Sequence, residues 1–173
     1  MTIDELQKAQ VEKTEELFPK LKRGSKSSVQ AYGGRFNLDE LESVSATAPS
    51  IFISFLGIKS AKEQEDERVR LNGLYTAFIV TTDARGLDRD TAGKNMAEIM
   101  AKWLPNNRFG LLDVSVPENI AAQNLYSGKA RGKGVALWAV SWSQAVTGDK
   151  SVFDSDAAVP STLYIGGELQ EDL

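Results

Sequence analysis

Residues 134–146 read Gly-Val-Ala-Leu-Trp-Ala-Val-Ser-Trp-Ser-Gln-Ala-Val, which is the most apolar run in the chain. Side chains alternate between the two faces of a β-strand, so this run predicts one aromatic and apolar face and a second face that begins apolar and ends polar. Such a pattern indicates a central strand, covered fully on one side and partly on the other. The first face carries Ala136, Trp138, Val140 and Trp142, and the second carries Val135, Leu137, Ala139, Ser141 and Ser143.

The two tryptophans on one face fix the register of this strand, because a slip of one residue would turn both to the wrong side. We interpret Trp138 and Trp142 as core residues, since aromatic side chains bury a large apolar area. The alternative is an aromatic platform for a ligand. It is the weaker interpretation, because no polar residues converge near them in the sequence.

The inventory of residue types excludes several chemistries. The chain has 173 residues, no Cys and no His. Disulfides, thiol chemistry, Ser-His-Asp and Cys-His triads, and the usual zinc sites are therefore ruled out. An enzyme built from this sequence would have to use carboxylates, Lys, Tyr or a carboxylate-bound metal. We expect no enzyme activity, no cofactor and no metal, because no carboxylate pair or nucleophile with a base stands out.

The composition is ordinary for a globular domain, with 42% hydrophobic and 25% charged residues. No apolar run approaches the length of a membrane span, and the first residues do not form a signal peptide. We therefore expect a cytosolic protein. The formal net charge of −4 argues against sequence-independent binding to nucleic acid over the whole surface.

The order of predicted elements indicates an α+β fold, a largely antiparallel mixed sheet with two main helices packed against it. We expect a single domain over residues 1–150 and an acidic, partly ordered C-terminal extension over residues 151–173.

Residues 2–18 predict a surface helix, which lies on its own domain or against a neighbouring chain. A capping box formed by Thr2 and Glu5 begins this helix, and Pro19 ends it. Strands are predicted at residues 29–32, 51–58, 71–82, 111–116 and 135–146, with a short late strand at 162–165; residues 38–41 predict a helical turn and residues 117–126 an irregular or briefly helical segment.

A second helix is predicted between the cap at Asp88 or Asp90 and the stop at Pro105. Apolar residues recur along it at spacings of three and four, which places them on one helical face. We predict that this face packs on the sheet as core. It consists of Ala92, Met96, Ile99, Met100 and Trp103.

Three charged segments are candidates for contacts. Residues 62–70 predict the exposed end of a hairpin, whose acidic residues are better explained by a solvated loop than by a hard-cation site, because the spacing does not match a calcium loop. Residues 20–26 form a basic segment, which we interpret as a solvated loop; a phosphate-binding patch is the alternative. Residues 128–134 form a Gly-rich basic loop that fails the phosphate-loop spacing; a plain hairpin loop is the simpler interpretation, and contact with phosphates or an acidic protein surface is the alternative. The acidic candidates are Glu63, Glu65, Asp66 and Glu67, and the basic candidates are Lys129, Arg131 and Lys133.

One part of the chain resembles a known family. Asn124-Leu125-Tyr126, the Gly-rich basic turn and the run from Gly134 to Gln144 look like the C-terminal signature of a Mu-like phage tail protein family. The predicted elements before it fit the layout of that family over most of the chain. The family resembles the tail terminators of long-tailed phages.

The resemblance implies a non-catalytic subunit that assembles with itself into a ring, a hexamer, at the head-proximal end of the tail tube. Its implied partners are the tail tube protein and the head–tail connector protein, with no membrane, and with DNA only as it passes through the ring lumen. The implied location is the host cytoplasm during assembly and then the virion tail. A second hypothesis from the residues alone stays open here: a small cytosolic enzyme or regulatory binding domain that uses carboxylates and Lys.

Overall fold

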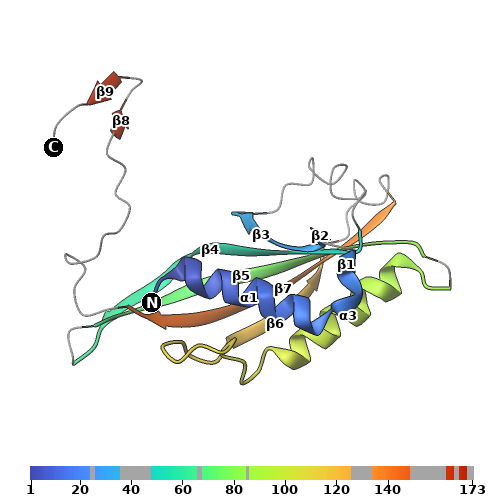
Figure 1. Ribbon diagram of the computed structural model, residues 1–173, viewed down its shortest axis with the longest axis horizontal. Coiled ribbons are helices and arrows are strands. Elements are labelled where there is room, and N and C mark those ends of the chain that lie inside the picture. The colour runs from blue at the N-terminus through green and yellow to red at the C-terminus, as the bar shows by residue number, and fades with distance from the viewer. Residues whose placement is uncertain are drawn as a thin grey trace.

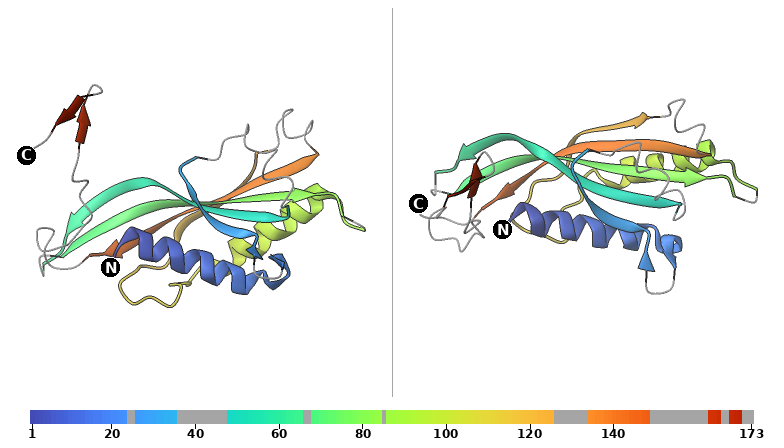
Figure 2. Two further views of the ribbon diagram at one scale, coloured as in Figure 1. Left: turned by 45° about the horizontal axis from the view of Figure 1, so that its top comes forward. Right: turned by 90° about the horizontal axis from the view of Figure 1, so that it is seen from above.

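The computed structural model describes residues 1–23, 26–35, 48–65, 68–84, 86–125, 134–148, 163–165 and 168–170. Its centre is a five-stranded sheet in the order β3-β4-β5-β7-β6, in which β3 pairs with β4 in parallel and the other pairs are antiparallel. Two helices, α1 and α3, lie on one face of this strongly twisted sheet (Figures 1 and 2). The predicted α+β class is confirmed. The strands are β3 (Val29–Gly33), β4 (Ser50–Glu63), β5 (Val69–Thr82), β6 (Glu118–Asn124) and β7 (Val135–Thr147), and the helices are α1 (Ile3–Leu17) and α3 (Arg89–Trp103).

The run that begins at Gly134 forms β7, the neighbour of the central strand β5. Its aromatic face meets the helices: Trp142 is almost fully buried and stacks on Tyr75 with a ring-centroid distance of 6.0 Å. Trp138 is partly buried and packs against the same core. Both tryptophans therefore belong to the core, as the sequence predicts.

The opposite face of the sheet changes character along β7, also as predicted. Leu137 and Ala139 are buried in a second, smaller apolar cluster with Phe52 and Phe78. Further along the strand, Ser141 pairs its hydroxyl with Thr76 at 2.9 Å, and Ser143 donates to the carbonyl oxygen of Glu118 at 3.2 Å.

Helix α1 begins with the predicted capping box, since Thr2 accepts from the Glu5 amide and the Glu5 carboxylate accepts from Thr2. The helix packs on its own sheet. Its buried residues are Leu6, Gln10 and Thr14, at a spacing of four. Two polar residues thus occupy the buried stripe, which is why the apolar stripe of this helix is thin in the sequence.

Two predictions in the region before β7 are wrong. Residues 111–116 do not form a strand, and only an isolated bridge joins Val114 to Val146. Left-handed backbone at Phe109 and Gly110 turns the chain before this segment. The segment then makes two backbone hydrogen bonds with β7, in which the Ser115 amide donates to the Ala145 carbonyl oxygen and the Thr147 amide donates to the Asp113 carbonyl oxygen. Residues 118–124, predicted as irregular or helical, form the edge strand β6. Its pairing with β7 overrides a composition of low β-propensity.

The remaining described elements are short. Residues 20–26, predicted as a solvated basic loop, lie in a 3₁₀ turn, η1 (Pro19–Leu21), and a short hairpin of β1 (Lys22–Arg23) and β2 (Lys26–Ser27). The helical turn predicted at residues 38–41 lies outside the described residues. Within the C-terminal region, β8 (Leu163–Ile165) pairs with β9 (Glu168–Gln170) and lies apart from the main sheet (Figure 1). The boundary near residue 150 stays a prediction.

Candidate functional site

The predicted acidic contacts lie at one end of the long β4–β5 hairpin. Glu63 closes β4 and is exposed, as is Glu65 in the turn beyond it, where the Gln64 amide donates to the Arg68 carbonyl oxygen at 2.8 Å. The described residues 62–65 and 68–70 therefore form the hairpin end that the sequence predicts, and they are exposed or partly exposed. Asp66 and Glu67 lie outside the described residues.

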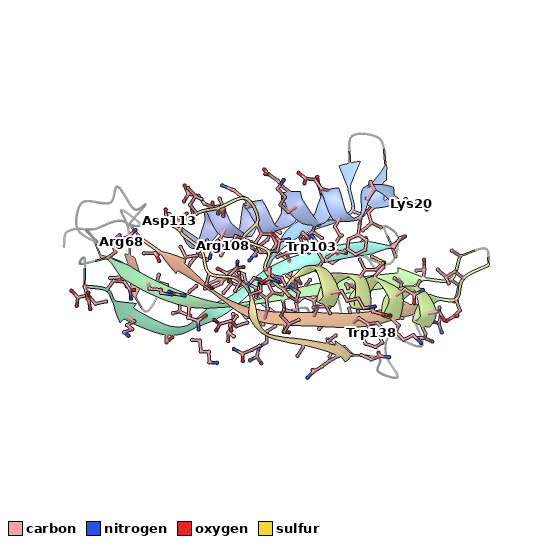
Figure 3. The ribbon with its side chains drawn as sticks, turned by 90° about the horizontal axis from the view of Figure 1, so that it is seen from below. Lys20, Arg68, Trp103, Arg108, Asp113 and Trp138 are labelled. Carbon is pink, nitrogen blue, oxygen red and sulfur yellow. The ribbon has the colours of Figure 1, made fainter. Side chains whose placement is uncertain are left out.

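This hairpin end carries charges of both signs. A hollow of about 560 Å3 is lined there by Lys62, Glu63, Gln64, Glu65, Arg68, Arg70 and Thr147. The Arg68 guanidinium lies 3.7 Å from the Asp113 carboxylate, and Figure 3 shows both residues close to Arg108. The hairpin end is therefore a polar surface on which the predicted acidic residues lie among cationic ones.

The predicted basic contacts Lys129, Arg131 and Lys133 lie outside the described residues. The residues that bracket them, Leu125 and Gly134, are at the other end of the sheet from the acidic hairpin end. The register shows this, because Val135 pairs with Thr82 whereas Thr147 pairs with Arg70. At about 3.3 Å per residue, β7 separates the two ends by about 40 Å. The acidic hairpin end and the two residues that bracket the predicted basic segment thus lie at opposite ends of β7.

An apolar groove lies between the C-terminal end of α1 and helix α3, and the sequence reasoning missed it. We call it the α1–α3 groove. It has a volume of about 610 Å3 and a mostly apolar lining, with Lys20 and Asp83 among its polar members. Leu87 and Ile99, which both line it, expose 42% and 46% of their surface. The lining residues are Leu17, Phe18, Pro19, Lys20, Leu21, Ala48, Pro49, Thr81, Thr82, Asp83, Ala84, Leu87, Ala92, Asn95, Met96 and Ile99.

The predicted core stripe of α3 is divided between two environments: some of its residues are buried against the sheet, and others line the groove. The residues of α3 that are fully buried are Gly93, Ala97 and Met100, which face the sheet. Met96 and Trp103 are partly buried, and Ile99 is exposed, so the prediction that the whole stripe is core is wrong for Ile99. Gly93 brings the helix close to the sheet, since a Cβ there would lie 2.8 Å from Trp138 Cδ1. The helix thus packs on the sheet through Gly93, Ala97 and Met100, and Ile99 is left exposed in the lining of the groove.

The ionisable groups with shifted pKa values are dispersed over the molecule. A hydrogen bond to Asp4 raises the pKa of Lys8, hydrogen bonds from Thr91 lower the pKa of Asp88, and a hydrogen bond from Lys102 lowers the pKa of Glu98. All three groups are on the surface. Burial raises the pKa of Tyr75, which lies in the core against Phe55 and Trp142.

The described residues contain no group of three or more carboxylates that could hold a metal ion. In the same part of the chain, neither helix is long and apolar enough to cross a membrane. The two surfaces that stand out are therefore the charged hairpin end and the α1–α3 groove. The sequence analysis singled out part of the groove lining, the apolar stripe of α3, but a linear pattern does not show that this stripe borders a groove.

The model of a protein family described as Bacteriophage Mu, Gp37 matches residues 5–147, from the first turn of α1 to the end of β7. No curated protein matches the chain. The matched range includes nearly all of α1, the whole of α3 and all five strands of the main sheet, so it covers nearly the whole packed unit. The resemblance to Mu-like phage proteins is confirmed, and the chain belongs to the bacteriophage Mu Gp37 family.

Proposed function

We propose that this protein is a non-catalytic tail assembly subunit of a phage or prophage, which forms a ring that ends growth of the tail tube and offers a surface for head joining. The observation that carries the proposal is the family match over residues 5–147. The host cytoplasm is then where the ring forms, and the virion tail is where it resides.

The placement of the predicted contacts supports ring formation. A ring needs a heterologous interface, in which two different surfaces of each subunit meet head to tail. The acidic hairpin end and the residues that bracket the basic loop lie at opposite ends of β7. In this proposal Lys129, Arg131 and Lys133 of one copy meet Glu63, Glu65, Asp66 and Glu67 of the next, with the tail tube protein and the head–tail connector protein bound on the rims of the ring.

The dispersed ionisable groups also favour an assembly role over the carboxylate-and-Lys enzyme or binding domain. A catalytic site concentrates shifted pKa values in a cleft. Here Lys8, Asp88 and Glu98 are surface groups on the helices or at a helix cap, and Tyr75 is enclosed by aromatic rings. The α1–α3 groove is mostly apolar, which suits a protein partner.

The experiment that tests the function is deletion of the gene from its phage, with tail lengths measured by electron microscopy. We expect tubes longer than normal and without heads, and restoration of normal length when the protein is supplied from a plasmid. Tails of normal length that still join heads in the deletion strain would contradict the terminator role. A point variant that unfolds the protein, such as Trp142→Asp, should reproduce the deletion and serves as the control for expression.

A further inference from the structure

The α1–α3 groove is an apolar surface of a size that a peptide segment fills. It is lined by η1, and the chain continues from η1 into β1 and β2. The sequence of this stretch has Lys20, Lys22, Arg23 and Lys26 within seven residues. Two large apolar side chains, Leu87 and Ile99, are about half exposed at this groove. An occupant of this groove would therefore combine apolar residues with nearby acidic ones.

A segment with that chemistry is present near the end of the same chain. Strands β8 and β9 pair antiparallel, with Tyr164 opposite Leu169 and Ile165 opposite Glu168. The two residues between the strands are both Gly, which two-residue hairpins favour. Four of the six strand residues are Leu, Tyr or Ile, and acidic residues follow at Glu171 and Asp172.

A two-stranded hairpin is only marginally stable by itself, because it has no second layer on which to bury its apolar residues. The β8–β9 hairpin belongs to a two-stranded sheet that is separate from the main sheet. The hairpin thus needs an apolar surface on which to pack, and the groove offers one. By sequence, the hairpin and the residues that follow it are acidic, with Glu168, Glu171 and Asp172, whereas residues 20–26 are basic, so the two segments have opposite charge.

The geometry disfavours docking within one chain. The groove lies at the end of the sheet where β7 begins, because Thr82 lines it and pairs with Val135. The C-terminal region leaves from the other end, after Thr147. In Figure 3, Lys20 lies at the opposite end of the molecule from Arg68 and Asp113, and the Asp113 carbonyl oxygen accepts from the Thr147 amide at 2.8 Å.

The span between these two ends can be compared with the reach of the connecting residues. The hairpin would have to return about 40 Å along β7. As a random coil, a connection of the length of residues 149–162 has a root-mean-square end-to-end distance of roughly 20 Å, and its fully extended limit is about 50 Å. Docking in the same chain needs near-full extension. Docking on a neighbour in a ring does not, because the neighbour can bring its groove close.

We propose that the β8–β9 hairpin of one copy docks in the α1–α3 groove of the adjacent copy, as an arm that links neighbouring subunits. This inference rests on the proposed function only in that both require self-assembly. The arm would add a second head-to-tail contact to the ring, apolar in its centre and ion-paired at its edge, beside the contact between the charged loops.

Cysteine crosslinking tests the arm directly, since the natural chain has no Cys. One full-length variant carries Asn95→Cys at the exposed lining of the groove, and a second, with a different tag, carries Tyr164→Cys in the hairpin. The matched control replaces Asn95→Cys with Glu12→Cys on the other helix, outside the groove. The two variants are mixed, assembled with and without purified tail tubes, and oxidised.

We expect a disulfide between the two tags with the groove variant, in at least about tenfold excess over the control, because docking raises the local thiol concentration toward millimolar. The doubly substituted chain should give a ladder of linked subunits. An intramolecular disulfide in that chain would overturn the claim of a neighbouring copy. Assembly without any groove-specific crosslink would overturn the arm and leave the ring intact, whereas absence of assembly under every condition would overturn both.

Discussion

At the scale of single residues, the close contact between Gly93 and the sheet determines how α3 sits. Gly in the middle of a helix lowers stability by about 0.5–1 kcal/mol relative to Ala. It is found here because a Cβ would lie 2.8 Å from Trp138 Cδ1 and 3.0 Å from Thr81 Oγ1. The Thr81 hydroxyl is itself fixed, since it donates to the Arg89 carbonyl oxygen at 2.7 Å.

The first prediction follows from this contact. Gly93→Ala should lower the free energy of unfolding by about 1–3 kcal/mol, the usual cost of overpacking, although helix propensity alone would raise it. The measurement is urea denaturation of the variant and the natural protein. Asn95→Ala, an exposed change two residues along the same helix, is the control and should be near neutral. A stabilised Gly93→Ala variant would show that the helix does not approach the sheet this closely.

A buried pair of glutamines joins three parts of the molecule. Gln10 and Gln144 are both fully buried, and Gln10 Nε2 donates to Gln144 Oε1 at 3.2 Å. Gln144 Nε2 in turn donates to the Ser115 carbonyl oxygen at 2.7 Å. The side chains thus tie α1 to β7 and to the segment before β6.

The second prediction concerns this link. Gln144→Leu should lower the free energy of unfolding by about 1–3 kcal/mol, because buried polar groups at Gln10 and Ser115 lose their partner. Gln123→Leu, the same change at an exposed position of the edge strand β6, should have little effect. Equal stabilities of the two variants, measured by chemical denaturation, would contradict the buried link.

At the scale of elements, the sequence predicts best where the pattern and the packing agree. The capping box at Thr2, the strand after Gly134 and the hairpin end near Glu63 are local features, and all are found. The edge strand β6 was missed because its pairing partner, not its own composition, makes it a strand. The groove was missed because it depends on the distance between α3 and the sheet, and a linear pattern does not contain that distance.

The third prediction concerns the start of α3 and its dependence on pH. The Asp88 carboxylate accepts from the Thr91 amide at 2.9 Å, and hydrogen bonds from Thr91 lower its pKa from 3.8. A carboxylate with a lowered pKa stabilises the folded state above pH 3.8, and this contribution is lost as the pH falls through the lowered value.

Asp88→Asn keeps a capping side chain but removes its charge. As the pH falls from 5 to below 3.8, the variant should therefore lose less stability than the natural protein. The measurement is the thermal midpoint of both proteins across this pH range. Glu12→Gln, which removes an exposed charge outside the caps, is the control. Parallel pH profiles for the natural protein and Asp88→Asn would contradict a charged cap.

At the scale of the whole molecule, the acidic hairpin end and the residues that bracket the basic loop lie at opposite ends of β7, and this arrangement suits the proposed head-to-tail ring. The fourth prediction is that reversing Lys129, Arg131 and Lys133 to Glu weakens assembly, because like charges then face the acidic hairpin end of the next copy. Reversing Lys8, Lys13 and Lys102 on the helices gives the same change in net charge and should leave assembly intact. Gel filtration at low salt compares the two variants, and identical elution of both as assembled species would count against the proposed contact.

A closed ring is the feature on which the proposed function of this protein most depends. Light scattering after gel filtration, performed on the full chain alone and after incubation with purified tail tubes of its phage, measures this directly. We predict one discrete multimer of ring size, either free in solution or bound at tube ends. A monomer at all protein concentrations that also fails to bind the tubes would contradict the claim.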